Sequence, residues 1–132
     1  MKIHHIGYAV KNIENSQEEF EKLGFRREDK MYKDMDRNIN VLFLINDSCV
    51  IELVSPIEEG SAVDNILSKV GNTPYHICYE TDDIQKSIAE LRGEKYKLLL
   101  KPKKAIAIEN NLVAFLFKKD VGLIELVEIK TN

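Results

Sequence analysis

The hydrophobic pattern of this chain predicts strands and helices in the same order in its two halves. In the first half, runs rich in β-branched and aromatic residues, bounded by turn residues, predict four strands at residues 2–10, 25–33, 39–46 and 49–55. After the first of these strands, Asn12 can cap a helix whose apolar residues Ile13, Phe20 and Leu23 share one face and which ends at Gly24. This half is therefore predicted to be a β-α-β-β-β module of about residues 1–57.

The second half repeats this order in a module of about residues 74–129. Four strands are predicted at residues 75–81, 95–101, 112–118 and 122–128. Asp82 or Asp83 can cap a helix with Ile84, Ile88 and Leu91 on one stripe, which Gly93 ends. Residues 102–109 fit a loop over a site and an extended edge equally well.

A short helix is predicted between the two modules, at about residues 61–69. Ser61 and Asp64 have the spacing of a capping box. Because each module, at roughly 65 residues, would be marginal alone, the two are expected to share a core within one domain of residues 1–132.

Two short motifs also recur between the halves. His5-Ile6-Gly7-Tyr8 returns as His76-Ile77-Cys78-Tyr79, an offset of 71 (76 − 5). Ile51-Glu52-Leu53-Val54 returns as Ile124-Glu125-Leu126-Val127, an offset of 73 (125 − 52). Each half therefore has one histidine and one glutamate that match those of the other half, in the same order, on strands that occupy equivalent places in the module.

The surroundings of the two glutamates favour a metal site. Glu52 would share one strand face with Val50 and Val54, while Ile51 and Leu53 occupy the other, so both faces are apolar. A carboxylate in such a strand must be protonated, paired or bound to metal, because burial of a lone charge is costly. Two neutral imidazoles and two carboxylates around one divalent cation form a neutral cluster.

Each residue also has an ordinary alternative. A single strand histidine is most often a core or surface residue, and a single strand glutamate most often faces solvent. Recurrence at matched offsets weakens both alternatives, because two modules related by a pseudo-twofold axis bring equivalent positions together. The sequence thus predicts a four-ligand site of His5, Glu52, His76 and Glu125. His4 is expected to be structural or solvent-facing, and Glu128 is expected to be solvated.

Composition excludes several classes of function. With 132 residues, a net charge of −3 and no large block of one sign, the chain does not favour nucleic acid as a partner. No apolar run is as long as a membrane span, and the start of the chain lacks a signal-peptide pattern, so a cytoplasmic location is expected. Cys49 and Cys78 lie in apolar segments and are expected to be reduced core thiols.

At the repeated motifs the chain resembles the vicinal oxygen chelate superfamily, which includes glyoxalase I and methylmalonyl-CoA epimerase. The resemblance covers nearly the whole chain and implies an α+β fold of two βαβββ modules that form a cupped mixed sheet. It also implies a six-coordinate Ni, Zn, Co or Mn ion held by His5, Glu52, His76 and Glu125. The shared chemistry is abstraction of a proton next to a carbonyl, with Glu125 and Glu52 as the candidate base and acid.

Three functions follow from the resemblance. The first is a glyoxalase I-like lyase that converts a methylglyoxal hemithioacetal into a 2-hydroxyacyl thioester. The second is an epimerase of a CoA thioester, such as methylmalonyl-CoA. The third is a metal-free drug-binding protein, which the presence of all four ligands disfavours. Epimerases of this group usually have a histidine where Tyr75 stands and a His-Pro where Lys118-Lys119 stands, so the sequence favours the glyoxalase. The resemblance also implies a homodimer, which is common in the family.

Two groups of cations are candidates for substrate contacts. The lysines at positions 95, 97, 101, 103 and 104 could meet a phosphate or a carboxylate, or could simply keep an edge strand solvated. Arg26, Arg27 and Arg37 could clamp an anion or serve as ordinary turn charges.

Overall fold

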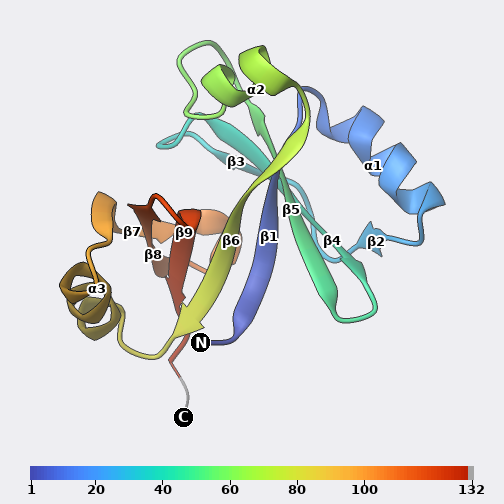
Figure 1. Ribbon diagram of the computed structural model, residues 1–132. Coiled ribbons are helices and arrows are strands. Elements are labelled where there is room, and N and C mark those ends of the chain that lie inside the picture. The colour runs from blue at the N-terminus through green and yellow to red at the C-terminus, as the bar shows by residue number, and fades with distance from the viewer. Residues whose placement is uncertain (131–132) are drawn as a thin grey trace. The chain divides into compact units, whose positions relative to one another are not determined.

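A computed structural model describes residues 1–130 and has the predicted elements in the predicted order (Figure 1). The strands are β1 (Ile3–Ala9), β2 (Arg26–Arg27), β3 (Tyr32–Asp34), β4 (Ile39–Asn46), β5 (Cys49–Pro56), β6 (Thr73–Thr81), β7 (Lys97–Ala105), β8 (Asn111–Lys118) and β9 (Gly122–Glu128). The helices are α1 (Ile13–Lys22), α2 (Asp64–Val70) and α3 (Ile84–Gly93), and a 3₁₀ turn, η1 (Ile106–Ile108), follows β7.

The chain divides into two compact units. The N-terminal unit is His5–Tyr75, and the C-terminal unit combines Met1–His4 with the chain from His76 onward. The first residues join the C-terminal unit because the backbone N–H of Glu80 donates to the carbonyl of Lys2 over 2.8 Å. The grouping of both modules into one domain stays a prediction.

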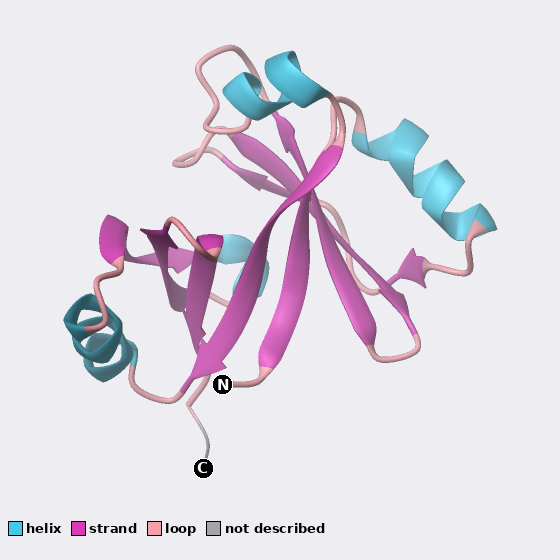
Figure 2. Cartoon of the chain, in the orientation of Figure 1, coloured by secondary structure: helices cyan, strands magenta, loops and turns pink. Residues whose placement is uncertain are grey.

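Both units have the same strand order and the same strand directions. In the N-terminal unit the order is β2-β4-β5-β1, with β1 parallel to β5 and β4 antiparallel to its neighbours, including β3. In the C-terminal unit the corresponding order is β7-β8-β9-β6, with β6 parallel to β9 and β8 antiparallel to its neighbours. The predicted α+β class with a mixed sheet is confirmed, and Figure 2 shows helices beside the strands of each unit.

Helix α1 covers one face of the N-terminal sheet. Its N-cap is Asn12, as predicted, and the side-chain oxygen of Asn12 accepts from the backbone N–H of Asn15 over 2.8 Å. The core beneath the helix contains six fully buried apolar residues: Val10, Ile13, Leu42, Leu44, Ile51 and Leu53. Leu23 was predicted to lie on the packed face of this helix, but it is exposed at the C-cap, where the helix has already ended.

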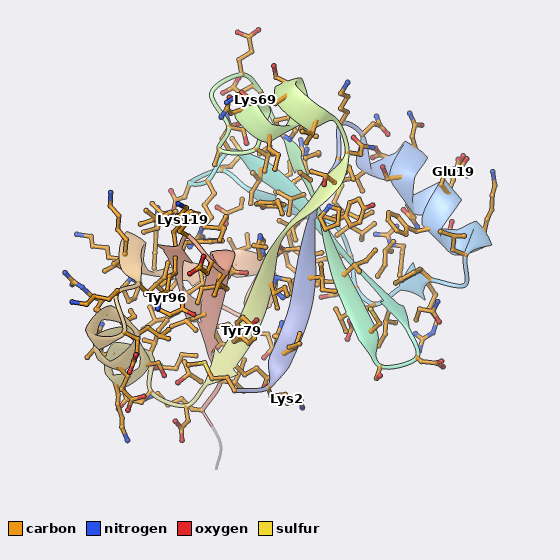
Figure 3. All side chains as sticks on the ribbon, in the orientation of Figure 1. Lys2, Glu19, Lys69, Tyr79, Tyr96 and Lys119 are labelled. Carbon is orange, nitrogen blue, oxygen red and sulfur yellow. The ribbon has the colours of Figure 1, made fainter. Side chains whose placement is uncertain are left out.

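Helix α3 covers the corresponding face of the C-terminal sheet. Of the two aspartates predicted as possible caps, Asp83 is the N-cap, and its side chain accepts from the backbone N–H of Lys86 over 3.1 Å. The core consists of Ile84, Ile88, Ala114, Leu116, Ile124 and Leu126, and Tyr79 and Tyr96, both labelled in Figure 3, pack against it.

Glu128 differs from its prediction. It is half-buried rather than solvated, and its Oε2 accepts from the backbone N–H of Ile84 over 3.0 Å. A carboxylate at a helix N-terminus satisfies an amide that the helix leaves without an internal partner. Glu128 therefore ties β9 to the first turn of α3.

Helix α2 covers the opposite face of the N-terminal sheet from α1. Val63 and Leu67 pack there against Ala9 and Val54, with Tyr75 partly buried beside them. The helix begins at Asp64, three residues later than predicted, because Asp64 Oδ2 accepts from the backbone N–H groups of Gly60 and Ser61 and so caps the turn before it.

Three other segments differ from the predicted pattern. The strand expected at residues 25–33 is broken into β2 and β3. The ambiguous residues 102–109 are an extended edge as far as Ala105, followed by η1. Both cysteines are free, as expected, but only Cys78 is buried, because Cys49 begins β5 at the exposed end of a hairpin. Within residues 1–130, none of the helices is long and apolar enough to cross a membrane.

The N-cap of α3 allows a direct test of this fold. Replacing Asp83 by Ala should lower the free energy of unfolding by about 1 kcal/mol, because the first turn of α3 loses a side-chain acceptor. Urea unfolding measures the change. Asp82→Ala is the matched control, since Asp82 is exposed and adjacent but is not the cap residue, and it should change the free energy of unfolding little. Equal effects of the two variants would contradict the assignment of the cap.

Candidate metal centre

The first His–Glu pair lies within the N-terminal unit, on adjacent parallel strands. His5 is on β1 and Glu52 is on β5, with Gly7 as the register partner of Glu52. The imidazole Nε2 of His5 is 3.4 Å from Oε1 of Glu52. Both residues are buried, His5 with 1% and Glu52 with 6% of its surface exposed, so the carboxylate is shielded from water.

The second pair repeats this geometry within the C-terminal unit. His76 is on β6 and Glu125 is on β9, and Cys78, two residues after the histidine, is the register partner of Glu125. His76 Nε2 is 3.1 Å from Glu125 Oε1, and each residue is 4% exposed. Since the register of histidine to glutamate is the same in both units, the repeated sequence motifs produce a repeated arrangement of donors.

A phenylalanine completes each pair, and the sequence analysis did not identify it. Phe43 on β4 is directly opposite Glu52, and its ring meets the His5 ring edge-on with centroids 5.3 Å apart. Phe115 on β8 is opposite Glu125 and meets His76 in the same way, also at 5.3 Å. The available signal was the offset of 72 (115 − 43), which lies between the offsets of the two motifs. These rings restrict the rotation of each imidazole.

The donor set of these residues fits a divalent transition metal. Each histidine offers a ring nitrogen and each glutamate a carboxylate oxygen, a set that Zn, Ni, Co and Mn accept. In each pair the imidazole nitrogen and the carboxylate oxygen lie close enough together for both residues to hold the same cation. Because each carboxylate is buried in an apolar strand, a bound cation would offset its negative charge in the folded protein.

The remaining histidine does not share this face. His4 alternates with His5 along β1 and is half-buried on the other side of the strand. That His4 is structural or solvent-facing rather than a ligand stays a prediction.

Two of the three arginines considered as anion clamps already have partners in the protein. Arg37 Nη1 is 2.9 Å from Oδ2 of the buried Asp34. Arg27 Nε donates to the carbonyl of Asp29 over 3.3 Å. The hydroxyl of Tyr32 donates to the carboxylate of Asp29 and holds the pKa of that group below its usual value. These contacts favour a role in the turns for Arg27 and Arg37.

A sequence profile of the Glyoxalase/Bleomycin resistance protein/Dioxygenase superfamily matches residues 4–115. The chain belongs to this superfamily. Because the match includes three of the four candidate ligands, His5, Glu52 and His76, it agrees with the predicted resemblance.

Individual relatives are epimerases. The chain is 26% identical over 131 residues to the ethylmalonyl-CoA/methylmalonyl-CoA epimerase of Cereibacter sphaeroides, covering 97% of this chain and 98% of that protein. It is 25% identical over 130 residues to the mitochondrial methylmalonyl-CoA epimerase of Dictyostelium discoideum, covering 96% and 78%. A variant of the Streptomyces coelicolor methylmalonyl-CoA epimerase in complex with 2-nitronate-propionyl-CoA matches with a TM-score of 0.86 and 26% identity, over 99% of both chains.

These comparisons change the order of the predicted functions. The sequence favours the glyoxalase over the epimerase, whereas these relatives support the epimerase. Tyr75, which was counted against an epimerase, packs beside α2 in the structure, so the identity of that residue reflects local packing as well as activity.

Metal binding by Glu125 can be tested separately from activity. Glu125→Gln should weaken binding of Ni or Zn in calorimetry and reduce the metal-induced rise in melting temperature, because the amide is a poorer ligand than the carboxylate. The same variant should not lower the melting temperature of the metal-free protein, since a neutral side chain replaces a buried charge.

Glu128→Gln is the matched control for this experiment. It makes the same chemical change three residues away on the same strand, and the amide oxygen can still accept from Ile84. Metal affinity that falls equally in both variants would count against Glu125 as a ligand.

Proposed function

We propose that this protein is a metal-dependent epimerase of a 2-carboxyacyl-CoA thioester, methylmalonyl-CoA or a close analogue. The observation that carries the proposal is the twice-repeated His–Glu pair at identical register, in a chain whose relatives over nearly its full length are epimerases of such thioesters. In this proposal His5, Glu52, His76 and Glu125 together hold one divalent cation, which would be Ni, Zn, Co or Mn.

The reaction requires removal and return of one proton at C2 of the substrate. That carbon lies between a thioester and a carboxylate, so its C–H bond is the most acidic in the acyl group. When bound, the cation would act as a Lewis acid on the substrate oxygens and stabilise the negative charge that develops during deprotonation. Inversion occurs when the proton leaves one face of C2 and a proton returns to the other, with no net change in electrons.

Glu52 and Glu125 are the candidate groups for these two proton transfers. Each has a buried carboxylate in a strand with apolar residues on both faces, so solvent water does not compete for the transferred proton. One carboxylate takes the C2 proton on an Oε atom while the other supplies a proton from the opposite side. His5 and His76 lie beside these glutamates, with Nε2 to Oε1 distances of 3.4 and 3.1 Å, and the rings of Phe43 and Phe115 meet the imidazoles edge-on.

The overall activity has a direct assay. Metal-loaded protein in deuterated water should convert one epimer of methylmalonyl-CoA into the other and introduce deuterium at C2, which chiral separation and mass spectrometry measure. Chelation should abolish the conversion, and metal addition should restore it. Isomerisation of a methylglyoxal hemithioacetal without any epimerisation would instead support the glyoxalase, and tight thioester binding that survives chelation without turnover would support a binding protein.

The two glutamates can be distinguished by starting from each epimer separately. If each carboxylate serves one face of C2, Glu52→Gln and Glu125→Gln should each lower epimerisation about 10²- to 10⁴-fold. Each variant should still exchange the C2 proton of one epimer, and the retained epimer should differ between the variants. Loss of exchange from both epimers in either variant would show that a single group, or the cation itself, is limiting there.

A further inference from the structure

The ligand-bearing faces of the two sheets are covered differently, although their ligand registers are the same. In the N-terminal unit, α2 packs over Val54 on the face of Glu52, and Phe43 and Val41 are buried. In the C-terminal unit the corresponding helix is missing from residues 76–130, and aromatic and aliphatic side chains on the face of Glu125 remain exposed. An exposed apolar surface beside a candidate reaction centre is a candidate surface for part of the substrate.

The strand registers show in which direction this surface is open. Opposite residues of antiparallel strands share a face, so Glu125, Phe115 and Leu100 form one row across β9, β8 and β7. The next row toward the turn between β8 and β9 is Leu123, Phe117 and Lys97. The row on the other side, formed by Val127, Val113 and Lys103, has both valines buried. Leu100 is 56% exposed and Phe117 is 40% exposed, so the apolar surface extends from Glu125 toward Phe117.

Positive charge lies at the end of this open surface. Lys97 is exposed, is directly opposite Phe117, and makes no ion pair within residues 1–130. The adjacent turn carries Lys119, which Figure 3 labels, and Lys118, whose Nζ donates to the carbonyl of Glu94. Cations in this region outnumber the two carboxylates of Glu94 and Asp120. An apolar path that ends at a cation suits a long uncharged arm that ends in a phosphate.

The dimensions fit a CoA thioester. From Glu125 to Lys97 the path crosses two strand spacings and two residues along the sheet, about 12 Å between backbone positions. A pantetheine arm is as long as about four extended residues, roughly 14 Å, so a thioester near Glu125 places the first phosphates within reach of the Lys97 side chain.

We propose that the pantetheine arm lies over Leu100 and Phe117 of the C-terminal unit and that Lys97 binds a phosphate at its nucleotide end. This inference rests on the proposed function, since it assumes a CoA thioester whose acyl group is near Glu125. The equivalent row of the N-terminal unit is Val50, Ile45 and Arg26. Beside it an acidic residue takes the place of Leu100, because the backbone N–H of Glu28 donates to the carbonyl of Phe43, the counterpart of Phe115. An acidic side chain there would repel the phosphates that Lys97 attracts.

The decisive variant reverses the charge of Lys97. With metal-loaded protein, Lys97→Glu should raise the KM for the CoA thioester about fivefold and leave kcat nearly unchanged, a change that added salt should reduce. The KM for the same acyl group on pantetheine alone, which lacks the nucleotide, should not change. Phe117→Ser should raise the KM for both substrates, because both have the arm. An unchanged KM for the CoA thioester, or an equal rise for both substrates in Lys97→Glu, would overturn the proposal.

Two controls come from the chain itself. Arg26→Glu makes the same charge reversal at the equivalent place in the other unit, since Arg26 is opposite Ile45 as Lys97 is opposite Phe117, and it should leave both KM values unchanged. Val121→Ser changes an exposed apolar residue in the turn beyond the path and should also have no effect. An effect of Arg26→Glu equal to that of Lys97→Glu would contradict the assignment of the arm to the C-terminal unit.

Calorimetry with CoA itself separates this proposal from the proposed function. If wild-type protein binds CoA, Lys97→Glu weakens the binding and no epimerisation occurs, the location of the arm stands and the proposed function fails. If epimerisation occurs and Lys97→Glu changes neither KM nor CoA affinity, the location of the arm is wrong and the function stands. Absence of both CoA binding and turnover would contradict both.

Discussion

The cost of burying a carboxylate in a β-sheet is the constraint on which this structure depends. Glu52 and Glu125 lie in β5 and β9, each of which has a neighbouring strand on both sides and apolar side chains on both faces. A charge in that position needs a compensating partner within the protein. In each unit the partner in contact is an imidazole, which a phenylalanine ring meets edge-on. The same local arrangement of glutamate, imidazole and phenylalanine therefore occurs in both units. A cation bound to such a pair would remove the remaining cost.

Duplication explains the ligands but does not explain selectivity. The strand order, the helix caps and the registers of histidine, glutamate and phenylalanine agree between the units. What differs is the covering of the ligand face: the chain between the modules supplies α2 to the N-terminal sheet, whereas the C-terminal face ends in an edge strand of leucines and lysines. Features that distinguish one substrate from another must therefore come from the parts that the duplication did not preserve.

The parts of the fold that the sequence predicts well are those encoded locally. Apolar runs bounded by turn residues place β4 and β5 within a residue, and the repeated motifs locate all four candidate ligands because histidine and glutamate recur at nearly constant offsets. Phe43 and Phe115 are harder to predict, because their recurrence at an offset of 72 (115 − 43) does not say which ring each of them meets. Glu128 escapes such analysis because its partner, Ile84, is 44 residues away. Strand β7 was only partly recognised, since an exposed edge strand lacks the one-sided burial that produces alternation.

The choice between lyase and epimerase illustrates the same division. Both activities use the same ligand pattern, so the motifs that identify the superfamily cannot separate them, and the sequence argument had to rely on positions such as Tyr75 and Lys118. In the structure Tyr75 packs with α2, and Lys118 lies over the ring of Tyr96 at 5.4 Å while it donates to a backbone carbonyl. Local contacts therefore influence which residue stands at each of these two positions, so the identities of Tyr75 and Lys118 are weak evidence for either reaction. A hemithioacetal and a CoA thioester differ in the reacting group and also in the length and charge of the thiol component. The surface that would distinguish the thiol components extends from Glu125 along the open rows of β8 and β7.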